Sequence, residues 1–210
     1  MLKNILILAI LLVTNLFLFG QQPFLEDYKV YASLIKTEIL DTTNSIVIIK
    51  KGIKTKETID NTYRIANNLN SKDLNSQYEI YGWTENSKKE RPSVIDSISR
   101  QFIIDYCNRK YDEFILTNQF NQTYKTVLIK KFPIKKKSVI RDWKNFYSEY
   151  PGSGGIFSFS RIFYYLPDKR IAIFYYWHRR NGLNGQGALA VMIKSNSIWQ
   201  LKYKIYLWSN

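Results

Sequence analysis

Apolar residues recur every three or four positions in two parts of the chain. The first runs from Phe24 to Ile35 and the second from Ile95 to Tyr106, with polar residues between the apolar ones. This spacing predicts two amphipathic helices, the first of about four turns. Two shorter helices are predicted at 58–67 and 139–147, and the polar stretch 67–77 is predicted to form a loop.

The remaining apolar residues cluster in runs rich in β-branched and aromatic side chains, which predict strands. Two such runs are short, at 46–49 and 126–129, and four longer ones fill the C-terminal third: 156–166, 170–177, 188–194 and 198–208. Apolar and polar residues alternate from Trp199 to Leu207, the period of a strand with two different faces. Short connections between the last strands predict an antiparallel meander.

Helices that precede a run of neighbouring strands are typical of an α+β fold. We therefore expect N-terminal helices packed on an antiparallel sheet that the C-terminal third mainly forms. The chain has 210 residues, a length that suits one domain over 21–210 after a leader segment.

Residues 1–20 have the pattern of a secretory signal peptide. Lys3 precedes an apolar stretch at 5–19, and Gly20 supplies a small residue at the cleavage site. The stretch is shorter than the ~20 apolar residues of a membrane span, so an uncleaved anchor is the less favoured alternative. The prediction is an exported protein, periplasmic or secreted, that is not integral to the membrane after cleavage.

The charge balance points to anionic partners. The chain has 31 Lys and Arg against 17 Asp and Glu, and loss of residues 1–20 removes only Lys3 from this count. Such a surface favours acidic glycans, lipid head groups or nucleic acid, and export makes nucleic acid the least expected of the three. The alternative is that the many lysines reflect the base composition of the genome.

Composition also limits the chemistry. A single Cys excludes an internal disulfide and a Cys-rich zinc site, and a single His excludes an HExxH motif. We expect no cofactor, no metal and no catalytic residue. Cys107 lies near the apolar face of the second predicted helix and is expected to be buried and inert. Pro151–Gly155 is interpreted as a turn that leads into the sheet, because a strand rather than a helix follows it.

The segment from His178 to Gly187 is the best candidate for a binding loop. It combines Arg179, Arg180 and the single histidine with three glycines. Arginines can grip a carboxylate or phosphate with paired hydrogen bonds, and the aromatic run 175–177 just before the segment is suited to stacking on a sugar or base. The alternative is a solvated hairpin loop. The candidate ligand-binding residues are Arg161, Tyr176, His178, Arg179 and Arg180.

Two other features bear on function. The run Lys125–Lys144 has eight basic residues and one acid. It fits an edge strand protected by lysines better than a patch for anionic membranes. No acidic residue follows Asp168, so the end of the predicted sheet lacks the carboxylate pair that glycoside hydrolysis requires.

The C-terminal part of the chain contains a set of short motifs: Asp142–Tyr147, Tyr150–Ser153, Phe157–Ile162, and the terminal Trp199 and Trp208-Ser209. In these motifs the chain resembles a family of small exported bacterial proteins without an assigned function. The family combines a Trp-Phe-Tyr helix, a Pro-Gly-Ser turn, a Ser-Arg strand and a glycine-rich hairpin. This chain departs from it at Phe163-Tyr164, where the family often has Gly-Phe, and in lacking a cysteine pair in the hairpin. The resemblance implies the fold and export, and assigns no substrate.

The leading hypothesis is therefore an exported cell-envelope or secreted domain, without enzymatic activity, that binds a protein partner or an anionic ligand. Two alternatives belong to other classes. One is an envelope hydrolase acting on peptide or glycan. The other is an immunity or inhibitor protein that blocks a toxin or enzyme through an aromatic surface.

Overall fold

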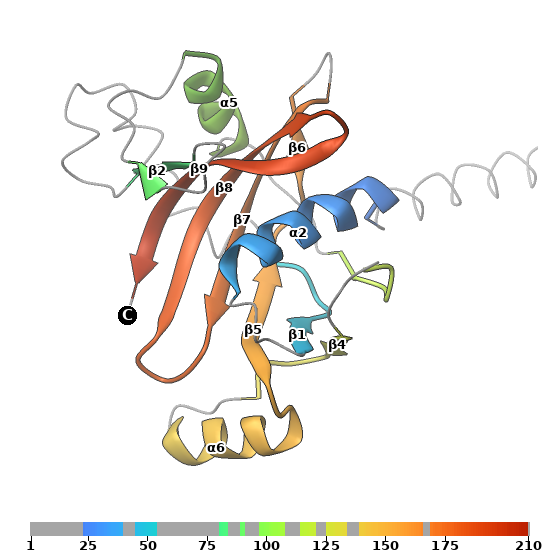
Figure 1. Cartoon of the computed structure of the whole chain (residues 1–210), viewed down its shortest axis with the longest axis vertical. Coiled ribbons are helices and arrows are strands. Elements are labelled where there is room, and N and C mark those ends of the chain that lie inside the picture. Colours follow the sequence, from blue (N-terminus) through green and yellow to red (C-terminus); the bar gives the residue numbers. More distant parts are fainter. Residues whose placement is uncertain are drawn as a thin grey trace, which may run out of the picture.

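The computed structural model describes most of the predicted domain (Figure 1). The described residues are 23–39, 45–53, 80–83, 89–90, 97–107, 114–120, 125–133, 139–165 and 169–209. The helices are α2 (Leu25–Glu38), α5 (Ser97–Cys107) and α6 (Val139–Glu149). The strands are β1 (Ser45–Ile49), β2 (Ile80–Trp83), β3 (Lys89–Glu90), β4 (Lys125–Ile129), β5 (Ser153–Phe159), β6 (Phe163–Tyr164), β7 (Ile171–Arg179), β8 (Gly185–Ser195) and β9 (Ile198–Ser209). The predicted signal peptide, the helix at 58–67 and the loop at 67–77 lie outside the described residues.

The strands form one sheet with the order β3-β2-β9-β8-β7-β5-β1-β4, and β6 pairs with β7. Strands β7, β8 and β9 are the predicted antiparallel meander. The sheet as a whole is mixed, because β1 pairs in parallel with both β4 and β5. The fold is α+β, as predicted, but the prediction of an antiparallel sheet throughout was wrong. Strands far apart in sequence have connections long enough for a parallel crossover, so hairpin rules do not apply to them.

Helix α2 crosses the face of the sheet that β5 and β7 present to it (Figure 1). The Tyr31 ring stacks on Phe159 with ring centroids 4.6 Å apart and meets the Phe174 ring edge-on at 5.2 Å. Its hydroxyl donates to the carbonyl oxygen of Ser160 at 2.8 Å. These contacts fix the middle of α2, and they bring its C-terminal turn over the strand ends where the candidate binding residues lie.

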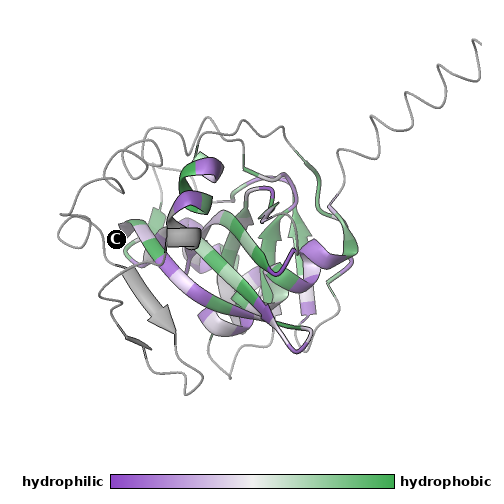
Figure 2. Ribbon diagram, turned by 90° about the horizontal axis from the view of Figure 1, so that it is seen from above, coloured by the Kyte–Doolittle hydropathy of each residue, from purple (hydrophilic) through white to green (hydrophobic). Residues whose placement is uncertain are grey.

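The other face of the sheet packs against two further helices. A cluster around Phe102 and Tyr106 joins α5 to β7, β8 and β9, and a cluster around Trp143 and Phe146 joins α6 to β1 and β5. Hydrophobic residues follow the strands of the central sheet in Figure 2. Cys107 belongs to the α5 cluster and is buried, as predicted, and burial raises the pKa of its thiol to about 12.

Strand β4 is the outermost strand at one edge of the described sheet. Lys125 at its start and Lys130 and Lys131 just after it are exposed. This is the position that the lysine-rich run predicts for an edge strand, where charge discourages pairing with another sheet. Among the described helices, none is long and apolar enough to span a bilayer.

Candidate functional site

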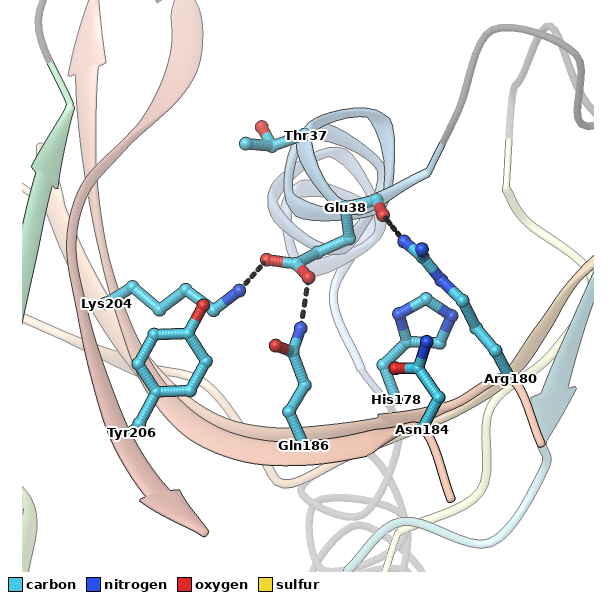
Figure 3. Close-up of a pocket in the computed structure, with 8 residues that line it drawn as sticks. All are labelled: Thr37, Glu38, His178, Arg180, Asn184, Gln186, Lys204 and Tyr206. Atoms are coloured by element: carbon cyan, nitrogen blue, oxygen red, sulfur yellow. Dashed lines mark hydrogen bonds and ion pairs between the residues drawn. The ribbon is translucent and has the colours of Figure 1, made fainter. Parts of the chain in front are cut away.

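A cavity of about 250 Å³ lies between the C-terminal end of α2 and the strands β7, β8 and β9 (Figure 3). Every residue that lines it has a polar side chain. The lining residues are Thr37, Glu38, His178, Arg180, Asn184, Gln186, Lys204 and Tyr206. Small-molecule sites are usually lined mainly by apolar side chains with only a few polar groups, so this composition favours a ligand rich in charge or hydrogen-bonding groups.

The alternation of β7 decides which predicted residues reach the cavity. Tyr176, His178 and Arg180 share the α2 side, because successive side chains of a strand point to opposite faces. Arg179 points the other way. Its guanidinium lies over the Trp208 ring, 5.2 Å from the centroid, and over the Phe132 ring at 5.5 Å. Arg179 therefore lies outside the cavity.

The segment expected to be a long loop is mostly strand. Strand β7 continues to Arg179 and β8 begins at Gly185, so the connecting loop is limited to 180–184. The glycines of β8 are needed for close packing. A Cβ on Gly187 would lie 2.1 Å from Nε1 of Trp208, closer than any real contact. In the sequence these glycines indicated a loop. In the structure they allow the Trp208 side chain to pack directly against β8.

Glu38 is the centre of the site, and sequence reasoning missed it. Its Oε1 accepts hydrogen bonds from the Tyr176 hydroxyl at 2.8 Å and from Nζ of Lys204 at 2.5 Å. The amide nitrogen of Gln186 donates to its Oε2. The end of the sheet thus does contain a carboxylate, which α2 contributes from almost 140 residues away.

Lys204 forms a buried ion pair with Glu38, and both side chains are about 5% exposed or less. Burial lowers the pKa of Lys204, while the Glu38 carboxylate opposes that shift. The ammonium group also lies 4.6 Å from the centroid of the Tyr206 ring. The alternation of β9 placed Lys204 on the polar face of its strand, and that face is covered by α2 rather than by water.

His178 is held as a neutral side chain. Its ring stacks on Phe157 with centroids 3.9 Å apart, and burial lowers its pKa to about 4. The ring Nε2 lies 2.7 Å from the carbonyl oxygen of Gly154. A carbonyl oxygen can only accept, so Nε2 carries the hydrogen of the neutral imidazole. His178 adds no positive charge to the cavity near pH 7.

The turn before β5 supports this histidine. Pro151 and Gly152 form a turn that leads into the sheet, as the sequence predicted, but β5 begins at Ser153 rather than at residue 156. Gly155 has φ +106°, and a Cβ there would lie 2.4 Å from the carbonyl oxygen of Arg179. A glycine is required at this point so that β5 can approach the end of β7.

Arg180 carries the charge that the site does not balance internally. Its Nη2 donates to the carbonyl oxygen of Glu38 at 2.6 Å, at the C-terminal end of α2. Its own carbonyl oxygen accepts from the Tyr147 hydroxyl, and its N–H donates to Asn184 O at 2.9 Å. Within the described part of the chain, no carboxylate lies within ion-pair distance of this guanidinium. Arg180 and Lys204 against Glu38 leave the cavity with one excess positive charge.

The structure brings together three of the five predicted residues: Tyr176 beside the cavity, and His178 and Arg180 on its lining. Arg161 is elsewhere, with its guanidinium over the Phe114 ring at 5.7 Å. The described lining has one carboxylate, which three donors already occupy. No group of three or more His, Cys, Asp and Glu side chains gathers in the described ranges.

Comparisons with protein-family models, with curated proteins and with solved structures found no match for this chain.

Proposed function

We propose that this protein is an exported, non-enzymatic binding domain that holds a small anionic ligand in the cavity beneath the end of α2. The observation that carries the proposal is the unbalanced charge. Arg180 and Lys204 line the cavity with a single carboxylate, Glu38, that is already hydrogen-bonded. In this architecture, N-terminal helices packed on a sheet from the C-terminal third serve as the scaffold of the site.

The geometry of Arg180 suits such a ligand. A guanidinium has five N–H donors. One hydrogen bond, from Nη2 to Glu38 O, holds the Arg180 guanidinium at the end of α2. The remaining donors can bind an anionic group with two parallel hydrogen bonds. The C-terminal end of α2 carries only a partial negative charge, so it offsets part of the guanidinium charge and leaves the rest for a ligand.

Charge at the level of the sequence supports the same proposal. The chain has an excess of 14 basic residues over acidic ones, which raises the local concentration of anions near the surface. The signal-like segment 1–20 is the basis for proposing that the domain acts in the periplasm or outside the cell.

The adjacent arginines provide a matched test. Arg180→Ala removes the guanidinium that lines the cavity, and Arg179→Ala removes one that packs on the opposite face. We expect the mature wild-type protein and Arg179→Ala to bind a member of a panel of acetate, phosphate, glucuronate and galacturonate in isothermal titration calorimetry. Arg180→Ala should bind that anion at least about ten-fold more weakly, the loss expected for a charged hydrogen bond.

The salt dependence separates the cavity from the basic surface. Binding in the cavity should weaken only moderately between 50 and 300 mM salt, because partly buried charges are less screened than exposed ones. Equal losses in both arginine variants, or no binding of any anion by the wild type, would contradict the proposal.

A further inference from the structure

The cavity contains more hydrogen-bonding groups than a simple anion can use. The guanidinium of Arg180 alone can bind a carboxylate with two parallel hydrogen bonds, which leaves the amides on the same wall for other groups of a ligand. The side-chain amide of Asn184 lines the cavity and makes no hydrogen bond within the described chain. Gln186 donates through its nitrogen to Glu38, which leaves its amide oxygen as an acceptor. Thr37 donates to Ser33 O at 3.1 Å and keeps its acceptor capacity.

These groups are arranged around the charged one. Arg180 and Asn184 stand at the two ends of the 180–184 loop, tied by the bond from Arg180 N to Asn184 O. Gln186 follows two residues later in β8, so its side chain projects on the same side of the strand as the cavity. Figure 3 shows Gln186 pointing toward Glu38 at the end of α2, with Asn184 drawn between Gln186 and Arg180. An acid bound to Arg180 would thus have amides within reach of its neighbouring atoms.

We propose that the ligand is a monomeric sugar acid, which combines one carboxylate with several hydroxyl groups on a single ring. The carboxylate binds Arg180, and the hydroxyl groups exchange hydrogen bonds with Asn184, Gln186 and Thr37. This inference rests on the proposed anion-binding function, and it adds the class of ligand.

The size of the cavity fits one ring. Its volume of about 250 Å³ lies just below the ~300–1,000 Å³ of typical small-molecule sites. A peptide or a long glycan chain would leave most of its length outside this volume. Fully polar walls also disfavour an apolar acid, because such a ligand would strip water from the side-chain amides of the wall without offering them a hydrogen-bond partner.

The aromatic side chains at the site argue against a nucleotide. One face of the His178 ring is covered by Phe157, and the Lys204 ammonium lies over the Tyr206 ring. The Tyr176 ring is fully buried. The buried rings of Tyr176 and His178 offer no open face for a base to stack on, and the Lys204 ammonium occupies one face of the Tyr206 ring. Base stacking is the usual source of affinity for nucleobases.

The test compares sugar acids with two simpler compounds, one that has only the carboxylate and one that has only the hydroxyl groups. The mature protein is titrated with D-glucuronate, D-galacturonate and D-gluconate, with acetate as the bare carboxylate and with D-glucose as the bare hydroxyl set. We expect at least one sugar acid to bind about ten-fold or more tightly than acetate, and glucose to bind at least that much more weakly than the same acid.

Two asparagines of the loop supply matched variants. Asn184 lines the cavity, whereas Asn181 lies outside it. The side chain of Asn181 accepts a hydrogen bond from Leu183 N at 2.9 Å within the loop. Asn184→Ala should weaken binding of the sugar acid about five-fold, as expected for one neutral hydrogen bond, and leave acetate unchanged. Asn181→Ala should leave both unchanged, and Arg180→Ala should weaken both.

The outcomes separate the two proposals. If acetate binds as tightly as every sugar acid and Asn184→Ala has no effect, the sugar-acid inference is wrong and anion binding stands. If glucose binds as tightly as the sugar acids, the carboxylate is irrelevant and both proposals fail. Absence of binding by all five compounds and by phosphate overturns both as well, whereas binding of phosphate alone overturns the sugar-acid inference and leaves anion binding standing.

Discussion

At the scale of single residues, His178 shows how burial sets the charge of the site. The ring lies between Phe157 and the cavity, it is 3% exposed, and its pKa falls to about 4. Near pH 7 it is a neutral hydrogen-bond donor to Gly154 O. The excess positive charge of the cavity therefore belongs to Arg180 and Lys204.

This burial predicts a pH dependence of stability. The unfolded chain takes up a proton on His178 near pH 6.5, and the folded chain does so only near pH 4. The stabilisation is therefore complete above pH 6.5 and is lost as the pH falls toward 4, a difference of about 3 kcal/mol. Urea unfolding at pH 7 and pH 4 measures it.

The variant His178→Phe is the control for that prediction, because it keeps an aromatic ring against Phe157 and removes the titrating group. The free energy of unfolding of the wild type should fall between pH 7 and pH 4 by about 3 kcal/mol more than that of the variant. Equal decreases in the two proteins would show that His178 has the same pKa in the folded and the unfolded protein, which contradicts the prediction.

At the scale of elements, α2 is attached to the sheet at both of its ends. Near the N-terminal end, Glu26 accepts from Nζ of Lys194 at 2.5 Å and from Nε1 of Trp199 at 2.8 Å. Partial burial would raise the pKa of Glu26, but these hydrogen bonds and one from Lys29 lower it to about 2. At the C-terminal end, Glu38 bonds to β7, β8 and β9. The cavity therefore lies beneath a helix end that is held in place.

The Glu38–Lys204 pair should be essential to this attachment. Glu38→Gln leaves the Lys204 ammonium buried without its counter-charge, and removal of one partner of a buried pair costs about 3 to 5 kcal/mol. We expect a decrease of that size in the free energy of unfolding, measured with urea at pH 7.

A second substitution separates charge from packing in that experiment. Adding Lys204→Met to Glu38→Gln removes the stranded charge and should recover at least half of the lost stability, because a well-packed apolar side chain replaces a buried ion. A free energy of unfolding of Glu38→Gln within about 0.5 kcal/mol of the wild type would contradict the role given to Glu38. A double variant less stable than Glu38→Gln alone would contradict it as well.

Local patterns explain which elements could be predicted from the sequence. The helical spacing before Ile35 and the alternation from Trp199 to Leu207 depend on neighbouring residues only, and both gave the right element. The place of β1 between β4 and β5 depends on pairing with strands far along the chain, and no local pattern encodes it. The extension of β7 through Arg179 was missed because the glycines of β8 imitate a loop.

At the scale of the whole molecule, the same distinction applies to the candidate site. His178 and Arg180 were found because basic and glycine residues gather in one segment. Arg179 was predicted together with them but lies outside the cavity, since its side chain takes the opposite face of the strand. Glu38 is joined to the site only by folding, and a lone acid in the last turn of a helix carries no signal of its own. Lys204 was recognised only as a polar position in the alternation of the last strand, and that pattern does not show that the residue pairs with Glu38 of α2.

The central claim is that the excess positive charge of the cavity binds an anion through Arg180. The most direct measurement is a nuclear magnetic resonance titration that follows the side-chain Nε–H signals of Arg179 and Arg180, assigned from the two alanine variants, as glucuronate, galacturonate or acetate is added. We predict that the Arg180 signal shifts and saturates while the Arg179 signal, over Trp208 on the opposite face, moves little. An Arg180 signal that stays unchanged while the protein binds the anion, or equal shifts of both arginines, would contradict the account.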